Sequence, residues 1–496
     1  MIKTIYIYWG QKFINAPKLV KKCLLSWKIK NPLWKIIELD DDNLSNYINI
    51  EDDIPNINDK KITHTVRSDI IRLSLLEKYG GCWCDATCLC TKPLDSWLNE
   101  YIQTGFFCFK QKNDRILSTW FLYSEKNNYI ITKWKEGVIN YVNQIDELGT
   151  TDITPSLDIW NENKFNYNHY FWCHYIFGDL YKSDIEFKNM YDNTPELYII
   201  NNLFSPHHFD FVRPITEQNK IFIKNNDNPM YKLSNRFDKS KYNKKSILYY
   251  LLNNTINLNN LKFIHIGKCG GTTISNHFKL EEYHIKKNYS DNENYIIWIR
   301  NPLKRFVSAF YFSYDIIHTD TSKLNINNLT LDNCLAPARI HYKMKHDHAY
   351  SKRYDYLINY FQNPNHLAES LTSEDENKKK LAFELMNSEH EHINKGIGWY
   401  LNNGKFIEEN YNNIVFVGCI ENMNDDLDKL SNILNTEIQL DKKIRENTNN
   451  HDKSLSETAI VNILNYYEKT DYKALQKLVD YHFISDELFE KYHIYK

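Results

Sequence analysis

Short apolar runs alternate with amphipathic stretches from the start of the chain. Residues 5–10 and 33–39 have the dense apolar character of buried strands, and residues 17–26 between them place their apolar side chains on one helical face. The chain therefore opens β-α-β. This order is typical of a doubly wound α/β domain.

A longer amphipathic stretch, residues 67–79, predicts a helix that ends at Gly80-Gly81. Its apolar residues recur with helical spacing, and Asp69 and Arg72 occupy a neighbouring stripe. The strand predicted next ends in the carboxylate of Asp85, at the edge of a sheet where α/β proteins bind ligands. Asp85 and Thr87 alone are a thin metal site, which Mg²⁺ or Mn²⁺ would complete with diphosphate oxygens and water.

The residues from Arg67 to Thr87, with Trp9-Gly10-Gln11, resemble the glycosyltransferases with a DXD motif, especially the capsular polysaccharide synthesis subgroup. The resemblance covers about residues 1–210 and implies a GT-A-like nucleotide-sugar-binding fold. It implies a nucleotide sugar as donor, expected to be a UDP-sugar, and Mn²⁺ or Mg²⁺ as cofactor. Thr87 stands where many relatives have the last aspartate of DXD, which weakens the expected metal site.

The same resemblance assigns roles to single residues. Trp9 would stack on uracil, Asp69 and Arg72 would hold hydroxyls of the donor sugar, and Asp85 would be the first aspartate of DXD. The residues expected to bind the nucleotide sugar are Tyr8, Trp9, Gly10, Asp69, Arg72 and Asp85, and those expected to bind the metal are Asp85 and Thr87.

Two phosphate-binding signatures lie in the second half of the chain. In the first, an apolar strand leads into a glycine-rich turn and the start of a helix, whose free N–H groups favour an anion. In the second, residues 295–299 form an apolar strand followed by Arg300-Asn301-Pro302, and Pro302 suits the first turn of a helix that carries Ser308. A Walker A loop has its lysine after the glycines, whereas Lys268 precedes Gly270, which disfavours a nucleotide kinase.

The paired signatures resemble the PAPS-dependent carbohydrate sulfotransferases of the heparan sulfate 6-O and 2-O type, where PAPS is 3′-phosphoadenosine 5′-phosphosulfate. The resemblance covers roughly residues 261–496 and implies a P-loop-like fold with a central parallel sheet. The residues that it assigns to PAPS are Gly267, Lys268, Cys269, Gly270, Gly271, Thr272, Thr273, Arg300 and Ser308.

Two residues take catalytic roles under this resemblance. His284 lies between the signatures and would accept the proton of the acceptor hydroxyl, while Lys268 would stabilise charge on the bridging oxygen. His277, on the preceding predicted helix, is the competing base.

The composition of the chain bears on its binding partners, on the state of its cysteines and on its location. The net charge of −2 implies no nucleic-acid partner and no general membrane affinity. Cys82, Cys84, Cys88 and Cys90 lack the spacing of zinc knuckles, so we expect buried free thiols. Met1 leads directly into a strand and no apolar run approaches about 20 residues, which predicts neither a signal peptide nor a transmembrane segment. The cytoplasm of a bacterium or of a virus-infected cell is the expected location.

These patterns together predict two α/β domains. Residues 1–235 would form the glycosyltransferase, 236–260 an Asn- and Lys-rich linker and 261–496 the sulfotransferase. The predicted function is bifunctional: sugar transfer from a nucleotide sugar and sulfation of a carbohydrate hydroxyl, with a glycan as acceptor. The alternative is a sulfotransferase with a single activity, whose first domain only binds glycan, and Thr87 makes the first domain the one expected to be inactive.

Overall fold

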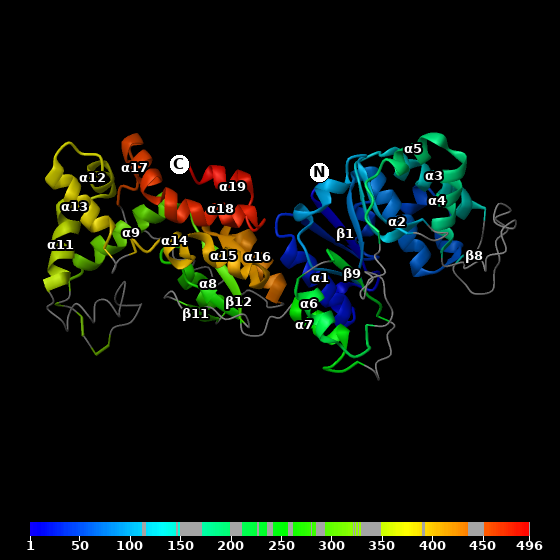
Figure 1. Cartoon of the computed structure of the whole chain (residues 1–496), viewed down its shortest axis with the longest axis horizontal. Coiled ribbons are helices and arrows are strands. Elements are labelled where there is room, and N and C mark those ends of the chain that lie inside the picture. Colours follow the sequence, from blue (N-terminus) through cyan, green and yellow to red (C-terminus); the bar gives the residue numbers. More distant parts are fainter. Residues whose placement is uncertain are drawn as a thin grey trace. The chain divides into compact units, whose positions relative to one another are not determined.

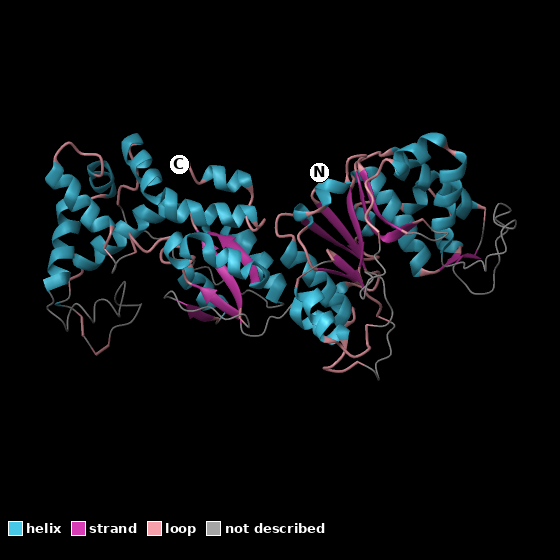
Figure 2. Cartoon of the chain, in the orientation of Figure 1, coloured by secondary structure: helices cyan, strands magenta, loops and turns pink. Residues whose placement is uncertain are grey.

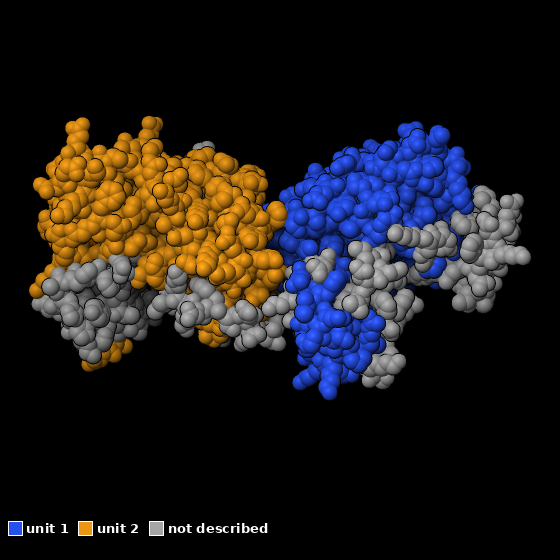
Figure 3. Space-filling model, viewed as in Figure 1, with its two compact units in different colours: residues 1–257 blue, residues 258–496 orange. Residues whose placement is uncertain are grey.

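The computed structural model of the chain describes residues 1–111, 116–144, 147–148, 171–198, 211–225, 228–235, 242–255, 261–278, 280–283, 293–320, 322, 324–325, 327–328, 349–388, 392–434 and 451–495. The chain divides into two compact units, residues 1–257 and 258–496 (Figure 3). Both units combine helices with parallel strands (Figure 2), so the mixed α/β class predicted from the sequence is confirmed.

The first unit is built on a five-stranded sheet with the order β2-β1-β4-β7-β6. Strands β2, β1 and β4 are parallel, and β7 runs antiparallel to both β4 and β6. The strands of this sheet are β1 (Thr4–Tyr8), β2 (Lys35–Leu39), β4 (Gly81–Asp85), β6 (Phe106–Lys110) and β7 (Leu117–Ser124). Two small sheets pair β3 (Lys61–Ile62) with β8 (Glu147–Leu148), and β5 (Cys88–Cys90) with β9 (Met230–Lys232).

Helices cover both faces of this sheet, because its strands are apolar on both sides (Figure 1). Trp83 packs in a core with side chains of α2, α3, α4 and α5, whereas its neighbours Cys82 and Cys84 pack on the opposite face with α1. The helices of the unit are α1 (Lys18–Lys30), α2 (His64–Tyr79), α3 (Tyr129–Asn143), α4 (Trp172–Ser183), α5 (Ile185–Asp192), α6 (Glu217–Lys224) and α7 (Ile247–Thr255).

The strand order has a topological switch point between β1 and β4, where α/β sheets bind ligands. Strand β1 has β2 on one side and β4 on the other, so the connections that leave β1 and β4 diverge at their carboxyl ends. Tyr8 and Asp85, the last residues of these strands, are partners in the parallel register.

The second unit has a four-stranded sheet with the order β11-β10-β12-β13, in which all neighbours are parallel. Its strands are β10 (Leu261–Ile264), β11 (Glu281–Tyr283), β12 (Asn294–Ile299) and β13 (Ile414–Cys419). Since β10 and β12 are parallel neighbours, the segments that follow them emerge at the same edge of the sheet. This edge holds both phosphate-binding signatures.

Helices form the larger part of the second unit and share one apolar core with its sheet. Helix α9 begins as the sequence predicts, with Pro302 in its first turn and the Asn301 side chain accepting from the backbone N–H groups of Leu303 and Lys304. The helices are α8 (Gly271–Phe278), α9 (Pro302–Ile317), α11 (Ala349–Phe361), α12 (Pro364–Ser370), α13 (Glu376–Met386), α14 (Ile397–Tyr400), α15 (Lys405–Asn410), α16 (Met423–Leu434), α17 (Glu457–Tyr467), α18 (Lys473–Asp480) and α19 (Asp486–Lys491).

The structure also bears on the cysteines and on membrane-spanning helices. Cys82, Cys84, Cys88 and Cys90 are buried free thiols, as predicted. Within the described ranges, no helix combines the length and the apolar character that crossing a membrane requires.

Candidate functional site

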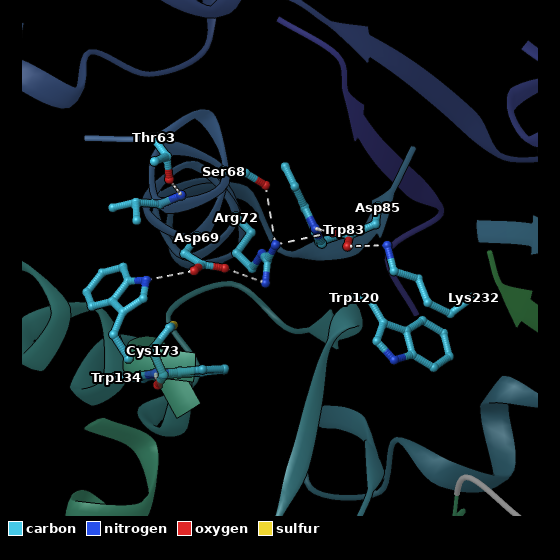
Figure 4. Close-up of polar contacts among 12 residues, drawn as sticks. Thr63, Ser68, Asp69, Arg72, Trp83, Asp85, Trp120, Trp134, Cys173 and Lys232 are labelled. Carbon is cyan, nitrogen blue, oxygen red and sulfur yellow. Dashed lines mark hydrogen bonds and ion pairs between the residues drawn. The ribbon is translucent and has the colours of Figure 1, made fainter. Parts of the chain in front are cut away.

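The carboxylate of Asp85 is the centre of a polar network in the first unit (Figure 4). Its Oδ1 accepts hydrogen bonds from Trp83 Nε1 at 3.0 Å and from Arg72 Nη2 at 3.2 Å. Its Oδ2 accepts from Lys232 Nζ at 2.8 Å. Asp85 therefore ends β4 as an ionised side chain held by two cations.

Helix α2 supplies the other half of the network. Asp69 and Arg72 lie one turn apart, and Arg72 Nη1 is 2.7 Å from Asp69 Oδ1. The other oxygen of Asp69 accepts from Trp172 Nε1 at 3.0 Å. The guanidinium of Arg72 thus links the two carboxylates, as Figure 4 shows. The structure brings together Asp69, Arg72 and Asp85, three of the residues that the sequence assigned to the nucleotide sugar.

The two carboxylates have opposite pKa shifts. Burial raises the pKa of Asp69 to about 6, although Arg72 acts in the opposite direction. Burial would also raise the pKa of Asp85, but the neighbouring charges of Lys232 and Arg72 outweigh it and hold that pKa below its usual range. Both groups are ionised at neutral pH, and each can accept hydrogen bonds from a ligand.

The carboxyl end of β1 lies beside this network. Tyr8, the register partner of Asp85, donates its hydroxyl to Asp41 Oδ1 at 2.5 Å. Asp41 also lies 3.8 Å from Arg67 Nε. Trp9 is half-buried, and its backbone N–H donates to the carbonyl of Leu39. The sequence did not assign a role to Asp41, and its only signal was the run of acidic residues that follows the second strand.

Lys232 is a second residue of this site that sequence analysis missed. Its ammonium donates to Asp85 Oδ2 and, at 2.7 Å, to Thr87 Oγ1. Lys232 lies on β9, far along the chain from Asp85, in a segment without a recognisable motif. Only the pairing of β9 with β5 brings it to the site.

The observed donor set does not fit the expected divalent cation. Asp85 and Thr87, its predicted ligands, are both bonded to the Lys232 ammonium, and Arg72 adds a second positive charge on Asp85. In the part of the chain that the structure describes, no three His, Cys, Asp or Glu side chains gather as a metal-binding group. Mg²⁺ and Mn²⁺ favour several oxygen ligands that carry no competing cation. Lys232 and Arg72 therefore compete with a cation for Asp85 and Thr87, and a metal held by these two residues stays a prediction.

The two phosphate-binding signatures meet in the second unit. After β10, the backbone turns at Lys268 and Gly270, with φ values of 68° and 77°, and α8 begins at Gly271. Arg300, directly after β12, donates from Nη1 to the carbonyl oxygen of Lys268 at 3.2 Å. A Cβ atom on Gly271 would lie 2.0 Å from Nε2 of His265, so the histidine ring occupies the space that a side chain there would need.

The donors at this edge suit an anion. Arg300 Nε is buried and has no hydrogen-bond partner among the described residues. Lys268 is partly exposed, and its Nζ lies 4.0 Å from the centre of the Phe312 ring. Burial raises the pKa of Cys269 to about 12, so its thiol stays neutral and adds no negative charge to the loop. Ser308 is half-buried on α9.

The predicted catalytic base His284 lies outside the described residues. Strand β11 ends at Tyr283 and runs parallel to β10. On β11, Glu282 Oε2 lies 2.8 Å from His265 Nδ1. This contact orients the His265 ring against Gly271, a relation that the sequence did not predict.

Comparison with known proteins bears on the first part of the chain. Residues 1–150 match a family model described as capsular polysaccharide synthesis protein. The matched stretch contains Asp69, Arg72, Asp85 and Thr87 but not Lys232. It bears out the resemblance of the N-terminal half over those residues, whereas the sulfotransferase resemblance of the second half stays a prediction.

Two searches complete the comparison. Among solved structures, the chain is similar to one described as PaToxG Glycosyltransferase, with 17% sequence identity and a TM-score of 0.25, over 38% of this chain and 72% of that one. No curated protein matches the chain.

Proposed function

We propose that the first unit transfers a sugar from a nucleotide sugar, expected to be a UDP-sugar, to a carbohydrate acceptor. The observation that carries the proposal is the Asp69–Arg72–Asp85 network at the carboxyl ends of β1 and β4. This is the crevice at which open α/β sheets bind nucleotides. The match of residues 1–150 to a capsular polysaccharide synthesis family supports it.

Each group has a role in the proposed transfer. The half-buried Trp9 stacks on the base of the donor, and the ionised Asp69 accepts hydrogen bonds from hydroxyls of the donor sugar. Arg72 fixes the distance between Asp69 and Asp85. In the reaction, the bond between the anomeric carbon and the diphosphate breaks, and the diphosphate leaves with the electron pair. The acceptor oxygen bonds to that carbon and its proton passes to solvent.

Incubating the whole chain with a panel of UDP-sugars and following UDP release tests the proposal. We expect turnover by the wild type and its loss in Asp85→Asn. Asp95→Asn is a matched control, because Asp95 also accepts from an indole and an ammonium, Trp34 at 3.2 Å and Lys3 at 3.1 Å. An absence of both UDP binding and UDP release in the wild type would refute the proposal.

For the second unit we propose PAPS-dependent sulfation of a carbohydrate hydroxyl. The contact between Arg300 and the Lys268 carbonyl carries this proposal, because it unites two loops that each have the character of a phosphate site. The buried Nε of Arg300, unpartnered within the described residues, supports an anionic ligand there. When bound, PAPS would supply the sulfonate group. Lys268, Arg300 and Ser308 would bind and orient it, and His284 would accept the proton of the acceptor hydroxyl.

Separate incubations with UDP-sugars and with PAPS distinguish the possible outcomes. Release of UDP in one and of adenosine 3′,5′-bisphosphate in the other supports two activities in one chain. Release of adenosine 3′,5′-bisphosphate alone supports the alternative, in which the first unit only binds glycan. If PAPS neither binds nor reacts in the presence of oligosaccharides, the sulfotransferase proposal is wrong.

A further inference from the structure

We propose that Lys232 provides the positive charge that stabilises the leaving diphosphate, so that the first unit transfers sugar without a divalent cation. This inference rests on the proposed glycosyltransferase function. Lys232 Nζ lies where the sequence predicted the metal, between Asp85 Oδ2 at 2.8 Å and Thr87 Oγ1 at 2.7 Å.

The position of Lys232 is fixed by its backbone as well as by its ammonium. Lys232 pairs with Cys88 in the antiparallel register of β9 and β5, and the next residue, Leu233, donates its N–H to the carbonyl of Thr87 at 2.9 Å. The stem of Lys232 therefore starts beside the chain segment that carries its two acceptors. Its side chain is 16% exposed, so it is largely shielded from solvent but not fully buried.

The charges of the site are already balanced. Asp69 and Asp85 are offset by Arg72 and Lys232, which are joined through contacts of 2.7, 3.2 and 2.8 Å. A divalent cation on Asp85 would meet the repulsion of two neighbouring cations in a partly buried region, where charges are poorly screened. Lys232 would have to leave before a metal could bind. An ammonium held by Asp85 and Thr87 is, in contrast, a preorganised charge that needs no rearrangement.

The chemistry requires a positive charge at this point. As the bond between the anomeric carbon and the diphosphate breaks, the electron pair stays on the diphosphate oxygen, and the acceptor oxygen bonds to the anomeric carbon. Lys232 stays protonated throughout and attracts the charge that grows on the diphosphate. Asp85 and Thr87 are positioning residues in this scheme, because they act by holding the ammonium.

Hydrolysis of UDP-sugars by the whole chain tests the inference, with water as acceptor. We expect the wild type to keep its rate in EDTA. Lys232→Met should lose about 10²–10³-fold in kcat, the usual effect of removing one preorganised group that stabilises the transition state. Lys135→Met is the matched control and should keep the wild-type rate. Lys135 is 15% exposed and likewise has two oxygen partners, Asp53 at 2.8 Å and Glu77 at 2.7 Å.

The outcomes separate the inference from the function on which it rests. If EDTA abolishes hydrolysis by the wild type and Mn²⁺ or Mg²⁺ restores it, the inference is overturned and the glycosyltransferase proposal stands. If the wild type neither binds UDP nor hydrolyses any UDP-sugar, with or without metal, both fail. Melting curves of both lysine variants show whether a loss of rate is a loss of fold. Should Lys232→Met unfold, the EDTA result and a Lys232→Arg variant that keeps metal-independent turnover decide the question.

Discussion

Arg305 and Asp471 form a buried ion pair in the second unit, with Arg305 Nε 3.4 Å from Asp471 Oδ2 and side chains that are 0% and 1% exposed. Arg305 lies on α9, five residues after Arg300, and donates to the carbonyl of His392 at 2.7 Å. Asp471 belongs to a π-helical turn, Glu468–Tyr472, and accepts from the N–H of Gly398 at 2.9 Å. The pair thus links α9, the helix that follows the second phosphate-binding signature, to the helices near the C-terminus.

Removing one member of this pair should strongly destabilise the protein. We expect Asp471→Ala to lower the free energy of unfolding by about 3–5 kcal/mol, because Arg305 would be left as a buried charge without its counter-ion. The exposed pair of Arg353 and Glu384, 2.7 Å apart, gives the control, and Glu384→Ala should cost less than about 1 kcal/mol. Urea unfolding of both variants checks the difference, and equal effects would mean that burial of the pair is not what matters.

The raised pKa of Asp69 predicts a pH-dependent stability. Burial raises that pKa to about 6, so the folded state binds the proton more tightly than the unfolded chain does. Protonated Asp69 therefore adds to the free energy of unfolding. This contribution is complete below about pH 4 and is lost as the pH rises through about 6, a loss of roughly 3 kcal/mol. Asp69→Asn removes this titration, so its stability relative to the wild type should rise over that interval.

Asp184→Asn is the control for this titration. The backbone N–H of Phe187 donates to the Asp184 carboxylate and lowers its pKa, so the titration of Asp184 is shifted away from the range in which Asp69 titrates. The stability difference between Asp184→Asn and the wild type should therefore change little above about pH 5, and it should not follow the rise expected for Asp69→Asn. Thermal melting at several pH values measures both variants. A flat difference for Asp69→Asn as well would contradict the assigned pKa.

The joined phosphate loops predict graded effects on PAPS affinity. Lys268→Ala and Arg300→Ala should each weaken binding by about 10–150-fold, since each removes a charge-assisted contact worth about 1.5–3 kcal/mol. Ser308→Ala should cost less, because it removes one neutral hydroxyl. Arg353→Ala, which removes an exposed guanidinium elsewhere in the unit, is the control for net charge. Calorimetry with PAPS that gives wild-type affinity for both charge variants would refute the proposed site.

His284 should separate chemistry from binding. We expect His284→Ala to bind PAPS nearly as tightly as the wild type while sulfation falls by about 10²–10⁴-fold, the usual contribution of a general base. The same change at His277 should be mild. The wild-type rate should fall on acidification through an imidazole pKa, because the protonated ring cannot accept a proton. Turnover on an oligosaccharide acceptor measures all three effects. An inactive His277→Ala beside an active His284→Ala would reassign the base and leave the sulfotransferase proposal intact.

The sequence by itself determined those features that depend on near neighbours. Helical periodicity placed Asp69 and Arg72 one turn apart, and the structure joins them at 2.7 Å. The spacing of Cys82 and Cys84 predicted buried free thiols, and the structure buries both, on the face opposite Trp83. The fixed φ of proline marked the start of α9 at Pro302. In each case the deciding interaction lies within a few residues of the chain.

Only the tertiary structure decided which distant residues contact these local features. Lys232 and Asp85 are 147 residues apart, and Trp172 and Asp69 are 103 apart. Such partners depend on the order of strands and on which helices cover each face, and neither leaves a periodic trace in the sequence. The expected metal site shows the same limit. Asp85 and Thr87 were visible as oxygen donors, but the ammonium that satisfies them comes from a strand whose position is set by pairing with β5.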